Sequence, residues 1–326
     1  MKIRTLLLIG AFFFSLISCV GQEKVYPELE IHRFDKECFA FLNDTSSLRI
    51  FSEDFLPLTH VFGEEVIGIG RADSIGFQSR LTGFFSEPTL MKLYTDEINT
   101  FSDISMYQSE LSTGMGRLQE SFPELKIPRI YMHVSGLNQN VVVTDEVLSV
   151  SADKYLGADY VLYQHFFYDY QRQLMSPDRL VPDLLLGFMM ANFPFEGNED
   201  ILLDRILYEG KLRYILSVCL PERQRWEYVG YTEEQYVWCE QNHSRIWKSI
   251  LGNKHLYTPD YLVTTQYLKE APYTAFLPQE SPGRAGTWVG YQIVSSFMKN
   301  HPGTSLQNLL QLTDAQAFLK KSKYKN

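Results

Sequence analysis

The residue best suited to chemistry in this sequence is Glu209, which stands in the run Tyr-Glu-Gly-Lys. Arg205 and Arg213 lie four residues before and after it, so all three would share one face of a helix. An ion pair with one of these arginines is the simpler interpretation of Glu209. The alternative is a polar pocket, in which a buried carboxylate would need a cationic partner.

Two predicted helices position this glutamate. The first covers about residues 181–192, has Pro182 near its start, and must end at Phe193-Pro194 because proline cannot continue a helix. It has no polar face, so we expect it to be buried all round. The second covers about residues 201–218 and follows acidic residues that suit a helix N-terminus. Glu209 lies in the middle of the second helix.

This arrangement resembles the skeleton of a gluzincin metallopeptidase site, in which the first helix supplies HExxH and the second a third metal ligand. No HExxH occurs in this chain, and the positions where its histidines would fall, residues 184–190, are all apolar or Gly. A catalytic zinc needs three protein ligands, which Glu209 alone does not supply. We therefore predict a degenerate zincin-like scaffold with no metal, no cofactor and no catalytic residue.

The candidate site is a groove that contains Glu209, Arg284 and Tyr291. Arg284 stands at the start of a Gly-rich segment that we expect to lead into a helix containing Tyr291. We predict that Arg284 contacts Glu209 and replaces the lost metal structurally. Gly286 and Gly290 share one face of that helix, and close helix packing is the favoured explanation for the pair, with ligand contact as the alternative.

The sequence contains none of the common catalytic or nucleotide-binding motifs considered next. The seven histidines are scattered, and no nucleophile elbow, phosphate-binding loop or dinucleotide-binding motif occurs. The net charge of −9 argues against a nucleic-acid partner, since phosphates require a basic surface. A pair of carboxylates for glycoside cleavage stays open, with Asp153 and Asp159 as candidates.

The N-terminus predicts export and lipidation. Lys2 and Arg4 precede an apolar run too short to span a bilayer, and the run ends in Leu-Ile-Ser-Cys at residues 16–19. That ending resembles a bacterial lipobox, so residues 1–18 would be a signal peptide and Cys19 the acylated first residue of the mature protein. An ordinary signal peptide with an incidental cysteine is the alternative. We expect a lipid-anchored protein of the cell envelope, at the outer membrane, with residues 19–27 as its tether.

Residues 28–326 show no linker, repeat or low-complexity stretch, which favours one domain. Its fold class is α+β, mostly helical with a small sheet. Strands are predicted at residues 29–34, 130–134, 141–143 and 147–150, and Thr232 with Gln235 predicts a capped helix that runs to Ile250. Cys38, Cys219 and Cys239 are an odd number; Cys219 and Cys239 could pair, or all three could be buried free thiols.

Taken together, the motifs of the chain resemble the GldB family of gliding-motility lipoproteins. The matching pieces are the lipobox, Asp-Lys-Tyr-Leu-Gly-Ala-Asp-Tyr at 153–160, Val-Pro-Asp at 181–183, Tyr-Glu-Gly-Lys at 208–211, Gly-Tyr-Thr-Glu-Glu-Gln at 230–235, Glu-Ser-Pro-Gly-Arg at 280–284 and Thr-Asp-Ala-Gln at 313–316. The resemblance implies an envelope lipoprotein associated with gliding and its linked secretion machinery. We expect a non-catalytic scaffold that binds other envelope proteins or peptides; a hydrolase, metal-free or with an unrecognised metal site, is the alternative.

Overall fold

A computed structural model of the chain describes residues 24–325, so the predicted signal peptide and Cys19 lie outside the described residues. The described chain is mostly helical with one four-stranded sheet, which confirms the predicted α+β class. No helix among the described residues is long and apolar enough to cross a membrane.

The sheet has the strand order β1-β2-β4-β3. Strands β1 (Ile31–Arg33), β2 (Arg129–His133) and β4 (Val147–Ser151) are parallel, while β3 (Val141–Val143) is an antiparallel edge strand. The first strand is shorter than predicted. Phe34, Cys38 and Phe41 recur at helical spacing and are fully buried, so the chain turns into helix α1 (Phe34–Asn43) directly after Arg33.

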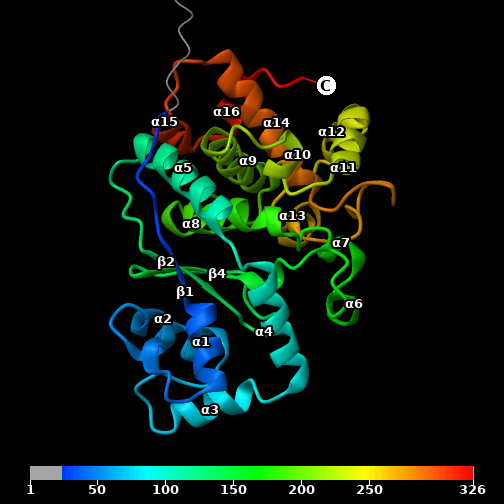
Figure 1. Cartoon of the computed structure of the whole chain (residues 1–326). Helices are drawn as coiled ribbons and strands as arrows, with labels where there is room; N and C mark the ends of the chain where they lie inside the picture. The colour runs from blue at the N-terminus through cyan, green and yellow to red at the C-terminus, as the bar shows by residue number, and fades with distance from the viewer. Residues whose placement is uncertain (1–23, 326) are drawn as a thin grey trace, which may run out of the picture.

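Helices lie on both sides of the sheet (Figure 1), and each face of the sheet carries its own hydrophobic core. Along β2, Ile130 and Met132 belong to one core and Tyr131 to the other, as the alternation of a strand requires. The N-terminal helices cover one face: α1, α2 (Leu56–Val61), α3 (Phe77–Phe84) and part of α4 (Pro88–Thr100). The larger core on the other face contains α5 (Ser105–Ser121), α8 (Leu180–Asn192), α9 (Leu202–Cys219) and α14 (Ala285–Asn300).

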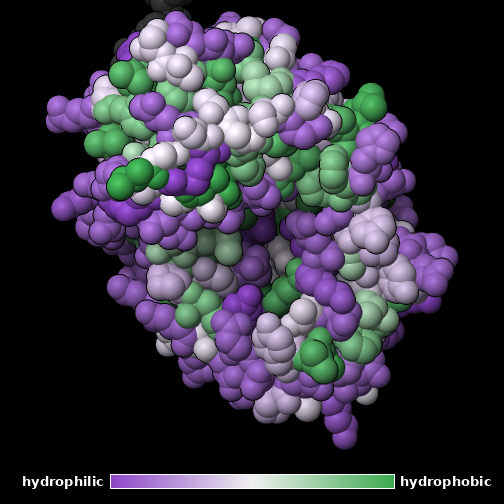
Figure 2. Space-filling model, turned by 90° about the horizontal axis from the view of Figure 1, so that it is seen from below, coloured by the Kyte–Doolittle hydropathy of each residue, from purple (hydrophilic) through white to green (hydrophobic). Residues whose placement is uncertain are grey.

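Shorter helices complete the larger half. They are α6 (Tyr163–Phe166), α7 (Asp169–Arg172), α10 (Arg225–Tyr228), α11 (Glu233–Gln241), α12 (His243–Gly252), α13 (Tyr261–Leu268), α15 (Leu306–Gln311) and α16 (Ala315–Ser322). The face of the molecule in Figure 2 is hollowed near its centre, and its apolar residues form small groups separated by hydrophilic ones.

Helices α8 and α9 begin and end within one residue of the predicted bounds. The expectation that α8 is buried all round is wrong at its C-terminal end, where Met190 is 45% exposed because the helix reaches the protein surface. The capping box of Thr232 and Gln235 is confirmed, but the helix ends at Gln241. Asn242 leaves helical geometry there, and its amide bonds the carbonyl of Trp238, a local contact that competes with a continuous helix.

Helices α9 and α14 cross at two glycines. A Cβ on Gly290 would lie 1.7 Å from the carbonyl oxygen of Ile206, and one on Gly210 would lie 2.3 Å from the backbone of Gly290. Only glycine permits so close an approach. The favoured explanation of the Gly286–Gly290 pair, helix packing, is thereby confirmed.

The segment before the sheet is already attached to the fold. The ring of Tyr26 packs at Gly116 of α5, and the amides of Leu29 and Ile31 donate to Ser112 and Gln108 of the same helix. The described part of the predicted tether therefore lies along α5. Cys38, Cys219 and Cys239 are all buried free thiols, so Cys219 and Cys239 do not pair.

Candidate functional site

The three residues of the predicted groove have different surroundings. Glu209 pairs with Arg213, one turn along α9, at 3.6 Å between Oε2 and Nη2, so the simpler interpretation of Glu209 is confirmed. Arg284 instead donates from Nη2 to the carbonyl of Gly230 at 2.8 Å. Within residues 24–325, the predicted contact between Glu209 and Arg284 is not formed, because the guanidinium of Arg284 is turned toward the loop before α11.

Tyr291 also lies away from a groove. It is 9% exposed on α14, and its ring centroid is 6.3 Å from that of Tyr228. Arg205, the other arginine near Glu209, pairs with Glu199 and lies over the ring of Phe195. Of the predicted site residues, Arg284 lines a polar pocket.

That pocket has a volume of about 330 Å³ and collects three arginines, one within a helix and two directly before helices. Arg179 precedes the first residue of α8, Arg213 lies in the middle of α9, and Arg284 precedes the first residue of α14. We call it the arginine pocket. Its other lining residues are Asn140, Val141, Lys154, Tyr155, Phe167, Gln171, Leu174, Met175, Asp183, Leu186, Gly187, Met190 and Glu270.

The three guanidinium groups are held by backbone carbonyls of one short segment, residues 227–230. Arg179 donates to the carbonyl of Glu227 at 2.5 Å, Arg213 to that of Tyr228 at 3.3 Å, and Arg284 to that of Gly230. This segment includes the end of α10, where the last carbonyls have no partner within the helix and can accept from cationic donors. One explanation of the arginines is therefore that they cap this helix end.

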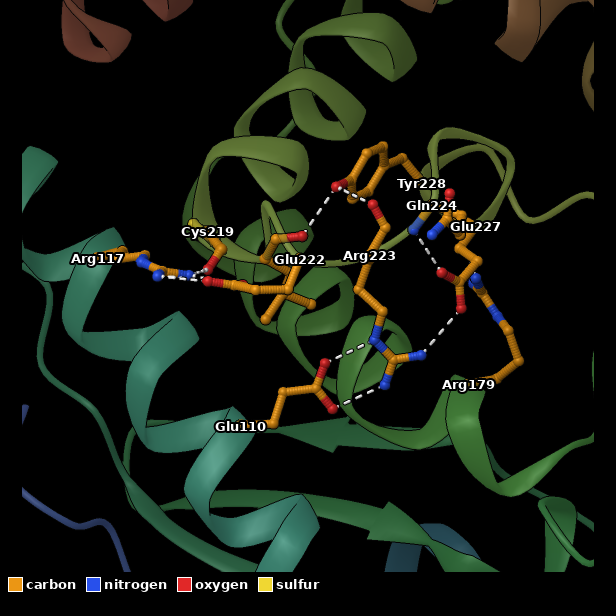
Figure 3. A network of polar contacts seen from close by, with 10 residues as sticks. Glu110, Arg117, Arg179, Cys219, Glu222, Arg223, Gln224, Glu227 and Tyr228 are labelled. Atoms are coloured by element: carbon orange, nitrogen blue, oxygen red, sulfur yellow. Dashed lines mark hydrogen bonds and ion pairs between the residues drawn. The ribbon is translucent and has the colours of Figure 1, made fainter. Parts of the chain in front are cut away.

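The segment is itself fixed to α5 by a network of ion pairs (Figure 3). Arg223 binds both carboxylate oxygens of Glu110, at 2.6 and 2.7 Å, and also Glu227 at 3.0 Å. Arg117 binds Glu222 in the same two-point manner, at 2.9 and 2.7 Å. Paired guanidinium–carboxylate contacts restrict orientation as well as distance. The carbonyls that hold the arginine pocket are therefore rigidly placed.

Two backbone features bring the arginines together. Gly230 has a φ of +68°, and a Cβ there would lie 2.7 Å from Nη2 of Arg284 and 3.7 Å from Nη2 of Arg179. Arg284 itself has a φ of +57°, a left-handed conformation that is uncommon for a residue other than glycine. Such conformations persist where the surroundings enforce them, and they concentrate at functional sites.

The pocket carries an excess of positive charge in an acidic protein. Lys154 and the three arginines are opposed in its lining by Asp183 and Glu270, and Glu209 pairs with Arg213 from outside the lining, which leaves an excess of one positive charge. Burial lowers the pKa of Arg213 to about 10; Glu209 opposes this shift, and the charges of Arg284 and Arg179 add to it. An anion in the pocket would relieve this repulsion, and guanidinium groups match the geometry of carboxylates and phosphates.

The capping explanation leaves part of each arginine unused. Each guanidinium has five N–H donors, and the Nε atoms of Arg179 and Arg213 are buried without a partner among the described residues. Arg179 also binds Asp183 at 2.5 Å, and Tyr155 donates to the other oxygen of Asp183 at 3.3 Å. The lining contains no Ser, Thr, Cys or His side chain. The arrangement is therefore suited to binding an anion.

A second polar cluster lies at the carboxyl end of the parallel strands but is closed to solvent. Asp35, Glu97 and Asp153 are all fully buried. Asp153 accepts the amides of Ser135 and Leu137, at 3.0 and 2.7 Å. Burial, and next the charge of Asp35, hold the pKa of Glu97 well above its usual range. Asp153, which follows β4, is thus a structural residue whose carboxylate holds the loop after β2. Among residues 24–325, no three or more His, Cys, Asp or Glu side chains form a group that could hold a metal ion.

Sequence reasoning missed Arg179 and Lys154 and took Arg213 only as a partner of Glu209. The available signal was an arginine inside an otherwise apolar helix stretch, Leu-Arg-Tyr-Ile-Leu at 212–216, and another directly before the most apolar helix. A charged side chain in such a place is buried only if it has a specific function or partner.

Comparison with known proteins establishes the family of this chain but not its zincin-like character. No curated protein and no solved structure matches the chain, so the zincin-like character of the core stays a prediction. One family model, described as gliding motility protein GldB, matches residues 21–326, which include every strand and helix described above. The chain therefore belongs to the GldB family of gliding motility proteins.

Proposed function

We propose that this GldB-family protein is a non-catalytic lipoprotein of the outer membrane that binds a protein or peptide partner in the gliding apparatus or its linked secretion machinery. The arginine pocket would receive an anionic group of that partner. The observation that carries the proposal is the convergence of Arg179, Arg213 and Arg284 on one pocket. Family membership supports the association with gliding motility and the cell envelope.

Physical chemistry favours binding over turnover in this pocket. Arginine stays protonated at any physiological pH, so it is a poor general acid or base but a good fixed donor. A buried guanidinium gains from each anionic partner because it has already lost its water. The excess positive charge would also attract an acidic segment selectively in a protein whose net charge is −9.

The test is recovery of partners from native membranes by the full-length lipidated protein. Arg284→Gln removes one pocket charge, while Arg225→Gln, which breaks an exposed pair with Glu240, is the matched control. We expect the same proteins to co-purify with the wild type and Arg225→Gln, and to be lost with Arg284→Gln. A soluble poly-glutamate peptide should release them from the wild type, which tests the anion requirement without any mutation. Equal recovery by both variants, with no release, would contradict the proposal.

A hydrolase is the second candidate, because Asp183 could act as an acid or base beside Tyr155 and Arg179 in the same pocket. Asp183→Asn separates the two functions: it should abolish peptide cleavage by a hydrolase, whereas a binding protein shows no cleavage before or after the change. Near-stoichiometric zinc in dialysed wild-type protein would also favour the hydrolase.

A further inference from the structure

The edge of the sheet beside the arginine pocket has unused backbone donors and acceptors. Within the β3–β4 ladder, Asn140 accepts from Ser151 at 2.9 Å and Thr144 donates to Val147 at 2.7 Å. Val142 stands opposite Ser149 in the same register. In an antiparallel ladder every second residue faces the neighbouring strand, so the backbone groups of Val141 and Val143 face away from β4. Between residues 24 and 325, neither has a hydrogen-bond partner on that side.

The one usual protection of this edge is its short length, since β3 has three residues. Proteins also shield exposed edge strands with lysine, proline, a bulge or a covering segment. Strand β3 is Val-Val-Val, flanked by Asn140 and Thr144, with half-buried side chains and no charge. Three β-branched residues favour an extended backbone that can accept another strand.

The direction of β3 connects this edge to the pocket. Asn140 and Val141, at the start of the strand, line the arginine pocket, and the strand then runs away from it toward Val143. A strand added antiparallel to β3 would run the opposite way. Its C-terminal end would therefore reach the arginine pocket.

We infer that the partner presents an extended C-terminal peptide, which pairs antiparallel with β3 and places its terminal carboxylate among Arg179, Arg213 and Arg284. The inference rests on the proposed function and specifies the anion. A volume of about 330 Å³ is at the small end of ligand pockets and suits the end of a chain better than a continuous chain. Leu186 and Met190 of α8 line the same pocket, so the last residue of the peptide is apolar.

Synthetic peptides test the two halves of this inference. The probe is a library of N-terminally labelled ten-residue peptides with free C-terminal carboxylates and varied last residues, screened by fluorescence anisotropy against the full-length lipidated protein in detergent micelles. Peptides with apolar last residues should bind, and amidation of the C-terminus should weaken binding about tenfold or more, as expected when a charge-assisted hydrogen bond is lost. Equal binding of amide and acid would overturn the inference.

If the peptide pairs with β3, the effect of N-methylation on affinity should alternate from one peptide residue to the next. N-methylation of a peptide backbone amide that faces β3 removes a hydrogen bond of the ladder. The next amide along the peptide faces away from β3, so its N-methylation leaves binding unchanged. In the protein, Val143→Pro removes an outward N–H without breaking the bonds to β4, and Val143→Thr keeps that N–H as the matched control. Affinity should fall about tenfold with proline and stay near wild type with threonine. Equal affinity of both variants, or no two-residue period, would exclude strand pairing.

Failure of this inference and failure of the proposed function give different results. Peptides that bind through internal acidic residues, depend on Arg284 and ignore C-terminal amidation would refute the terminal-carboxylate model and leave anion binding intact. A library in which no peptide binds in an Arg284-dependent manner would count against both.

Discussion

Replacement of Gly290 by alanine should destabilise the protein through the crossing of α9 and α14. The added Cβ would lie 1.7 Å from the carbonyl oxygen of Ile206, so that oxygen must retreat by about 1.7 Å to reach the ordinary contact distance of 3.4 Å. The neighbour is backbone and cannot rotate away, so the two helices must separate. Overpacking of a core costs about 1–3 kcal/mol and more where backbone must move, while alanine in place of glycine regains about 1 kcal/mol of helix propensity. We expect a net loss of about 2–3 kcal/mol.

Gly83→Ala is the matched control, since Gly83 also lies within a helix and a Cβ there would meet nothing within 4 Å. It should raise the free energy of unfolding by about 0.5–1 kcal/mol. Urea denaturation followed by circular dichroism measures both variants, and Gly290→Ala should also lower Tm by about 4 °C or more. Because Arg213 lies on α9 and Arg284 directly precedes α14, partner recovery should fall as well. A Gly290→Ala protein as stable as Gly83→Ala would refute the assigned crossing.

Three further predictions follow from individual side chains. Burial lowers the pKa of His133 to about 3, so below about pH 6.5 the folded protein binds fewer protons than the unfolded chain, and stability is lost as the pH falls. Relative to His133→Gln, the wild type should lose about 2 kcal/mol of unfolding free energy between pH 6.5 and 5 in urea titrations. Parallel curves of unfolding free energy against pH for the two proteins would show that His133 is not buried in its neutral form. Glu209→Gln leaves Arg213, whose side chain is 8% exposed, without its carboxylate partner and should lower the unfolding free energy by about 1–3 kcal/mol in thermal denaturation. The control Glu199→Gln breaks an exposed ion pair and should cost under about 1 kcal/mol. Equal losses in the two variants would show that the buried ion pair is worth no more than the exposed one. Cys19→Ser should abolish metabolic labelling with palmitate and change the membrane association of the protein, and unchanged labelling would exclude Cys19 as the lipidation site.

The sequence by itself determined the elements whose signals are local. Helices α8 and α9 were placed within a residue by proline, an acidic helix start and a dense apolar pattern, and β3 by three consecutive valines. Thr232 and Gln235 marked a helix start because capping involves residues only three apart. The family was also visible in the sequence, since its short motifs depend on order and spacing along the chain.

Only the tertiary structure decided which charged residues meet. Arg179, Arg213 and Arg284 are spread over more than a hundred residues and converge because residues 227–230, fixed to α5 by ion pairs, offer them backbone carbonyls. The same segment draws Arg284 away from Glu209, which is why the predicted contact is not formed. A contact of this kind depends on the orientation of three helices, and local sequence patterns do not encode that orientation.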